Sequence, residues 1–147
     1  MKSLLYLSIP FIIATIGYAQ ENPNSIADSL YLQGEKLKDL QNYDVAIANY
    51  LECLRKYELN KNYNGQVKAN KSLGLVYQNL GQYNKSRDYY NKALSILENH
   101  PNGLLLSYVM NNLGMLADTK NDLDSATYFY KESLRLKTIL KDSATMS

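Results

Sequence analysis

The sequence predicts an all-α protein: an α-solenoid of three antiparallel helix hairpins. Glycines at positions 34, 74 and 114 are spaced at forty residues, each within apolar residues at helical spacing. No segment alternates apolar and polar residues over the length of a strand. A chain of 147 residues with 46% hydrophobic and 20% charged side chains can bury one core.

The first residues have the pattern of a secretory signal peptide, predicted at 1–19. Lys2 precedes an apolar stretch from Leu4 to Tyr18, and small residues at Gly17 and Ala19 favour cleavage before Gln20. The alternative is an uncleaved anchor, but a run of about fifteen apolar residues is shorter than the roughly 20 that span a bilayer. We therefore expect an exported protein, periplasmic or extracellular, whose mature part does not insert into the membrane. Residues 20–26 are predicted to be a linker.

The three glycines predict close helix contacts. Gly34, Gly74 and Gly114 each lie in the middle of a predicted helix. Glycine there costs about 1 kcal/mol relative to alanine. Three glycines in one register therefore indicate that a neighbouring helix passes too close for a larger side chain.

A turn and a second helix follow each glycine-containing helix. In the turns, Gly81 and Asn121 can adopt the left-handed conformation that ends a helix. Asp44, Asn84 and Asp124 are predicted to cap the helices that follow. In those second helices the register aligns three tyrosines, Tyr50, Tyr90 and Tyr130.

These patterns set the element boundaries. Predicted helices cover 26–40, 44–59, 65–80, 84–98, 103–118 and 122–139. Loops are predicted at 60–64 and 99–102, where Pro101 disfavours helix at His100. The hairpins form three units, 27–66, 67–106 and 107–140, followed by a tail at 141–147.

The units resemble tetratricopeptide repeats. That family has a 34-residue unit with small or apolar residues at fixed positions. Counted from Ala27, Val67 and Ser107, the eighth position is glycine in every unit and the twenty-fourth is tyrosine. The period of forty is similar to that of longer members of the superfamily. Departures from the pattern are Gln33, Asn70 and Ser86.

Residues that could carry catalysis are few. His100 is the single histidine and lies in a predicted loop. Asp122 and Asp124 are predicted to cap a helix, and Cys53 occupies a small packing position. No metal-binding or nucleophile motif is present. We expect a protein that is not an enzyme and uses no cofactor or metal. A net charge of +2 also argues against a nucleic-acid partner.

The resemblance implies that the first helix of each hairpin lines a concave, ligand-binding groove. Each position can equally be an ordinary solvated helix face; only Leu75, Tyr108 and Met115 form an apolar cluster costly to expose. The family's carboxylate clamp is disfavoured, because its positions here mostly lack strong donors. The candidate groove contacts are Tyr31, Glu35, Lys38, Lys68, Lys71, Leu75, Gln78, Asn79, Tyr108, Asn111 and Met115.

Two functions follow from these patterns. The first is an exported scaffold that binds a protein or peptide segment in the groove. The alternative is the input fragment of a transmembrane bacterial signalling protein, of the histidine kinase or transcriptional regulator type. The last helix carries Leu134, Leu136, Ile139 and Leu140. We expect this edge to contact a second copy or a continuation of the chain.

Overall fold

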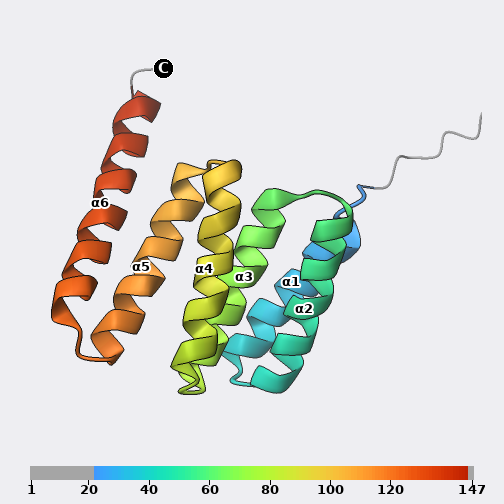
Figure 1. Ribbon diagram of the computed structural model, residues 1–147. Helices are drawn as coiled ribbons and strands as arrows, with labels where there is room; N and C mark the ends of the chain where they lie inside the picture. Colours follow the sequence, from blue (N-terminus) through green and yellow to red (C-terminus); the bar gives the residue numbers. More distant parts are fainter. Residues whose placement is uncertain (1–21, 146–147) are drawn as a thin grey trace, which may run out of the picture.

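Six α-helices make up the part of the chain that the computed structural model describes, residues 22–145 (Figure 1). No strand occurs among these residues, so the predicted all-α fold is confirmed. The predicted signal peptide at 1–19 lies outside them. The helices are α1 Ser25–Asp39, α2 Tyr43–Leu59, α3 Tyr63–Asn79, α4 Tyr83–Asn99, α5 Gly103–Thr119 and α6 Leu123–Thr145.

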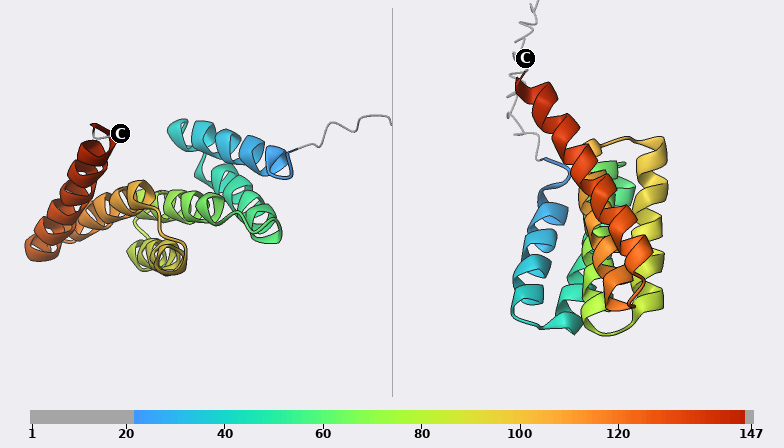
Figure 2. Two further views of the ribbon diagram at one scale, coloured as in Figure 1. Left: turned by 90° about the horizontal axis from the view of Figure 1, so that it is seen from above. Right: turned by 90° about the vertical axis from the view of Figure 1, so that its left-hand side faces the viewer.

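The helices form three antiparallel hairpins that stack in chain order. The closest packing is within the pairs α1 and α2, α3 and α4, and α5 and α6. Helix α3 also contacts α1, α2 and α5, which joins the hairpins. Viewed from above, the stack curves, with α1, α3 and α5 on its inner side and α2 and α4 on its outer side (Figure 2).

Four of the five turns use the same backbone motif. The second residue after the helix end is left-handed. The amide of the next residue donates to a carbonyl five residues earlier, as from Asn62 to Tyr57 at 2.9 Å. Gly81 and Asn121 adopt this conformation as predicted. The four left-handed residues are Gln41, Lys61, Gly81 and Asn121. The turn between α4 and α5 lacks a left-handed residue and passes through His100 and Pro101.

Two predicted boundaries are wrong at the connection between α2 and α3. The segment 60–64 is not a loop, because α3 begins at Tyr63. The side chain of Asn62 caps this helix by accepting a hydrogen bond from the amide of Gly65 at 2.9 Å. Since Lys61 supplies the left-handed residue, this connection needs no more chain than a turn within a hairpin.

The caps predicted at Asp44, Asn84 and Asp124 are also misplaced. The three helices begin one residue earlier, so these side chains lie inside the first turn. At α6 the carboxylate of Asp122 accepts from the amide of Ser125 at 3.2 Å. A carboxylate within the first turn still faces the positive end of the helix dipole.

Helix α6 is longer than predicted. It continues past the expected end at 139 to Thr145, so most of the predicted tail at 141–147 is helical. No glycine or proline interrupts these residues, and Leu140 packs against Gly103 at the start of α5. In Figure 1 the end of α6 projects beyond the other helices.

Each hairpin is held by a glycine that faces a tyrosine ring. A Cβ atom on Gly34 would lie 2.6 Å from Cε1 of Tyr50, too close for any real contact. The pair Gly74 and Tyr90 is tighter still, and Gly114 and Tyr130 repeat the arrangement. The rings of Tyr50 and Tyr90 are fully buried, so neither can move aside.

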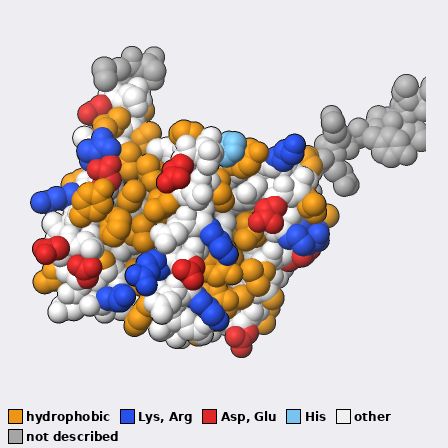
Figure 3. Space-filling model, in the orientation of Figure 1, with side chains coloured by type: hydrophobic (Ala, Val, Ile, Leu, Met, Phe, Trp, Pro, Cys, Tyr) orange, Lys and Arg blue, Asp and Glu red, His pale blue; other side chains and the backbone are white. Residues whose placement is uncertain are grey.

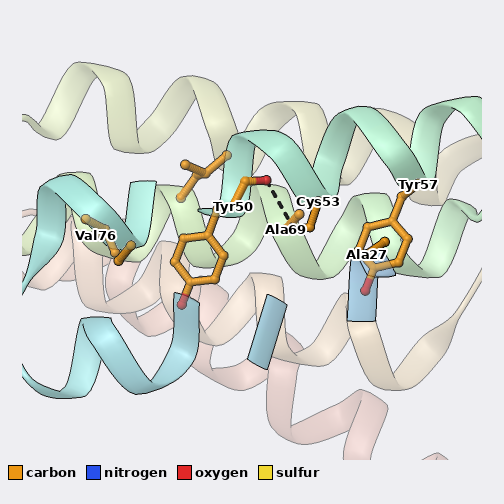
Figure 4. Packing of buried hydrophobic residues seen from close by; sticks show 8 residues of the cluster. Ala27, Tyr50, Cys53, Tyr57, Ala69 and Val76 are labelled. Atoms are coloured by element: carbon orange, nitrogen blue, oxygen red, sulfur yellow. Dashed lines mark hydrogen bonds between the residues drawn. The ribbon is translucent and has the colours of Figure 1, made fainter. Parts of the chain in front are cut away.

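Tyr57 makes a fourth contact of this kind, which the sequence did not predict. Its ring lies against Gly65, at the start of α3. Figure 4 shows Tyr50 and Tyr57 projecting from α2 toward α1, beside Cys53 and Ala27. Tyr57 thus joins the first hairpin to the second as well as closing the first.

We expect Gly34→Ala to lower the free energy of unfolding by roughly 1–2 kcal/mol. Alanine is the better helix former by about 1 kcal/mol, but crowding a packed core costs about 1–3 kcal/mol or more. Urea denaturation measures the difference. Gly103→Ala is the matched control, because its Cβ would lie 3.4 Å from Leu140 in ordinary contact. Equal stability of Gly34→Ala and the wild-type protein would contradict the prediction.

Candidate functional site

The eleven predicted groove contacts all lie on α1, α3 and α5, the helices of the inner side of the stack. None of them is buried. We call the surface they form the inner face. It has three sections, one on each helix. They differ in how many of their side chains already form hydrogen bonds or ion pairs within the protein.

The α1 section is occupied by a polar network centred on Glu35. Its Oε1 accepts hydrogen bonds from the hydroxyls of Tyr50 at 2.6 Å and Ser72 at 2.7 Å. Its Oε2 accepts from Nζ of Lys38 at 2.8 Å. The hydroxyl of Tyr31 lies 3.3 Å from that of Ser72. The network therefore ties α1 to α2 and α3, and three of the predicted contacts already have internal partners.

This environment shifts the protonation of the groups within it. Burial opposes the charge on Glu35, but the hydrogen bonds from Lys38, Tyr50 and Ser72 outweigh it and lower the pKa of this carboxyl. Burial raises the pKa of Tyr31 to about 12. Glu35 is thus an anion and Tyr31 a neutral donor or acceptor at neutral pH.

The α3 section is polar and partly cationic. Lys68 is exposed, whereas Lys71 is half-buried, and this burial lowers its pKa. Gln78 accepts from the hydroxyl of Tyr90 at 3.2 Å and its amide lies 3.4 Å from the hydroxyl of Thr119. Gln78 therefore connects α3 to α4 and α5, while Asn79 is exposed to solvent.

The α5 section is the apolar part of the inner face. Tyr108 and Met115 are 41% and 38% exposed. Residues at these spacings share one face of a helix. Asn111 lies between them and donates to the sulfur of Met115 at 3.6 Å. Leu75 holds the register position on α3 that Met115 holds on α5, but is only half-exposed.

Leu104 extends this surface and is not among the contacts that the sequence predicts. It lies four residues before Tyr108 on α5 and is 47% exposed. The third repeat unit begins at Ser107 and so excludes this residue, but the four-residue spacing from Tyr108 indicates that both side chains share one helix face. We call Leu104, Tyr108 and Met115 the α5 stripe. Nζ of Lys137, from α6, lies 5.8 Å from the ring centroid of Tyr108.

The residues considered for catalysis lie elsewhere. The Cys53 thiol is buried, which raises its pKa to about 12, and it donates to the carbonyl of Tyr50 at 3.2 Å. His100 stacks on the ring of Tyr63. Within residues 22–145, no three histidine, cysteine or acidic side chains are grouped to hold a metal ion. Across the same range, no helix has both the length and the apolar character to cross a bilayer.

Comparison with known proteins bears on the repeat unit. Residues 66–138 match a family model described as tetratricopeptide repeat. This match supports the resemblance of these residues to the tetratricopeptide repeat family. Such repeats typically bind proteins or peptides and are not catalytic. The search of curated proteins found no match to the chain.

The matched segment covers most of α3, all of α4 and α5, and most of α6. The hairpin of α1 and α2 lies before it, yet has the same glycine against the same tyrosine, Gly34 and Tyr50. All three hairpins therefore share the same contact between a glycine and a tyrosine ring.

We expect Glu35→Gln to lower the free energy of unfolding by about 1–2 kcal/mol at pH 7, because charge-assisted hydrogen bonds are lost. The folded-state pKa of Glu35 lies below its ordinary 4.5, so its stabilisation is complete above that pH. It is lost as the pH falls through the lowered pKa. The free energies of unfolding of the wild-type protein and Glu35→Gln are measured by denaturation from pH 7 to pH 3. Their difference should become smaller as the pH falls. A constant difference would contradict this.

Glu52→Gln is the control. Glu52 pairs with Arg55 on the surface of α2 at 2.8 Å. Exposed pairs of this kind contribute little because water and salt screen them. We expect nearly unchanged stability at pH 7.

Proposed function

We propose that this chain is an interaction scaffold that binds a protein or peptide segment on its inner face, with the α5 stripe as the main contact. The exposure of Leu104, Tyr108 and Met115 along one helix supports this most directly. Apolar side chains gathered on one surface are costly in water and suit burial by a partner. A tetratricopeptide match over the same helix agrees with a binding role.

A charge on α3, the helix of the inner face that contacts α5, defines the partner further. Lys68 on α3 is exposed and forms no ion pair with a carboxylate in the described part of the chain. Glu35 is the acidic residue among the predicted groove contacts, and its carboxylate already accepts hydrogen bonds from three donors. It therefore does not neutralise the charge of Lys68. We therefore expect the segment to place apolar or aromatic side chains on α5 and an acidic group toward α3.

Peptide selection tests the proposal. Peptides are selected from a random display library on the immobilised protein, and their dissociation constants are measured by calorimetry. The variant Tyr108→Ala with Met115→Ala should weaken binding by about tenfold or more, as hot-spot contacts do. Unchanged affinity in this variant would show that the α5 stripe is not the site.

Leu51→Ala is the matched control. Leu51 is 43% exposed, as much as Tyr108, but lies on α2, outside the inner face. We expect it to bind selected peptides as the wild-type protein does. Thermal melting of each variant separates loss of binding from loss of fold.

Export is the second part of the proposal, and it rests on the sequence of residues 1–19. The basic start, the apolar stretch and the small residues before Gln20 support it. Expression in a bacterium followed by fractionation and intact mass measurement should give an envelope protein lacking these residues. Ala19→Arg should block the cleavage. An intact cytoplasmic product of the wild-type sequence would contradict export.

The alternative, an input segment of a transmembrane signalling protein, is favoured by the outer edge of α6. Leu134 is 66% exposed, whereas Leu54 and Leu94 at the same register position are half-buried. A further helix packed there would cover it. Sequencing the gene downstream separates the two: a reading frame that continues into an apolar segment supports signalling, and a stop codon supports the scaffold.

A further inference from the structure

A cavity of about 290 Å³ lies between α4, α5 and α6. On α5 it is lined by Leu113, Leu116 and Ala117, which occupy a different side of the helix from Tyr108 and Met115. The cavity is therefore separate from the inner face. The rest of its lining comes from α4, with Arg87 and Asn91, from the turn between α5 and α6, with Lys120 and Asp122, and from Phe129 on α6.

The same place between α2, α3 and α4 is filled. Helices α2, α3 and α4 begin forty residues before α4, α5 and α6, so each cavity residue has a counterpart there. The counterpart of Ala117 is Tyr77. Its ring stacks on Tyr89 with centroids 5.4 Å apart and planes at 6°, and Nζ of Lys85 lies 5.1 Å from its centroid.

Between α4, α5 and α6 an aromatic side chain is present at the position of Tyr89, but no ring occupies the position of Tyr77. Phe129 holds the position of Tyr89, and Ala117 holds that of Tyr77. The loss of a tyrosine side chain at 117 accounts for open space beside Phe129. An aromatic ring from outside the chain could stack there as Tyr77 does on Tyr89.

The rim of the cavity also differs between the junctions. Arg87 and Asn91 replace Ile47 and Leu51. The Arg87 guanidinium donates to Oδ1 of Asn84 at 3.1 Å, but no carboxylate among the described residues forms an ion pair with it. The carboxylate of Asp122 is engaged as the cap of α6. Lys120 also lines the cavity, but it lies close enough to Asp122 to help lower the pKa of that carboxyl. Arg87 is therefore the cation that favours an anion at this rim.

We propose that this cavity is a second binding site, which accepts an aromatic side chain of a peptide segment with a carboxylate beside it. The ring lies over Ala117 against Phe129, and the carboxylate faces Arg87. Ligand pockets typically measure about 300–1,000 Å³, so this cavity suits one ring rather than a larger molecule. The remaining affinity must come from the adjoining chain, which favours a peptide over a free aromatic acid. Figure 3 shows hydrophobic side chains over α5 and α6, with Lys and Arg side chains among them.

The test is a titration of the full chain with a peptide that contains Glu-Tyr and has both ends blocked. Binding is measured from changes in the amide NMR shifts of the protein. Shifts should concentrate around Ala117, Ser125 and Phe129. The peptides with Gln-Tyr and Glu-Ala in place of Glu-Tyr should each bind about tenfold more weakly, because one lacks the charge and the other lacks the ring. Equal binding of all three peptides, or tighter binding of N-acetyltyrosine alone, would overturn the proposal.

Ala117→Tyr supplies the ring from within the chain and should abolish peptide binding at this cavity, seen as loss of the amide shifts around Ser125 and Phe129, while leaving the thermal midpoint unchanged or higher. Ala48→Tyr, at an exposed position of α2, is the matched control and should bind normally. Arg87→Ile, which restores the residue of the first junction, should remove the preference for Glu-Tyr over Gln-Tyr. A folded Ala117→Tyr protein that binds as well as the wild-type protein would overturn the site.

Binding to this cavity is independent of the function proposed for the inner face. The variant Tyr108→Ala with Met115→Ala should therefore bind the Glu-Tyr peptide with unchanged affinity. If it loses the peptide while Ala117→Tyr keeps it, the second site is wrong and the inner face is the site of this peptide as well.

Discussion

The contact of a glycine backbone with a tyrosine ring is the constraint on which this structure depends. Gly34, Gly74 and Gly114 each lack a side chain where the partner helix places its ring. The ring fills the space between two helices that would otherwise be kept apart by a Cβ atom, which sets their distance. Because the contact recurs in every hairpin, the three units have one shape and stack in one direction. The curved inner face follows from that repetition.

The three hairpins share this backbone arrangement but differ in their side chains on the inner face. The residue that follows each glycine illustrates the difference. Glu35 is bound by side chains of α1, α2 and α3 and stabilises the packing of the first hairpin. Leu75 is half-covered and Met115 is exposed. The inner face therefore changes from a satisfied polar network at α1 to an apolar surface at α5. A partner gains little from contacts that are already made internally, so its binding energy must come chiefly from the α5 section.

The junctions between hairpins have diverged in the same way. A stacked pair of tyrosines closes the junction of α2, α3 and α4, whereas alanine at 117 leaves the next junction open. Arginine in place of isoleucine at its rim adds charge to that opening. A repeat protein can thus keep its helix packing through the glycine contacts while it varies the residues between units. Tyr57, which contacts Gly65 across the first junction, has the smaller Leu97 as its counterpart.

The sequence by itself determined the helical class, the three hairpins and the close approach at the glycines, because these depend on local periodicity and on the absence of a side chain. It placed helix starts and ends less well. The short turn at 60–62 and the helix beyond residue 139 depend on backbone hydrogen bonds and on packing against Gly103, which no local pattern contains. Only the tertiary structure decided which surface residues are free. In the sequence Glu35 has the pattern of an exposed charge, and only the folded chain places the hydroxyls of Tyr50 and Ser72 against it. The space beside Ala117 likewise exists only because three helices meet there.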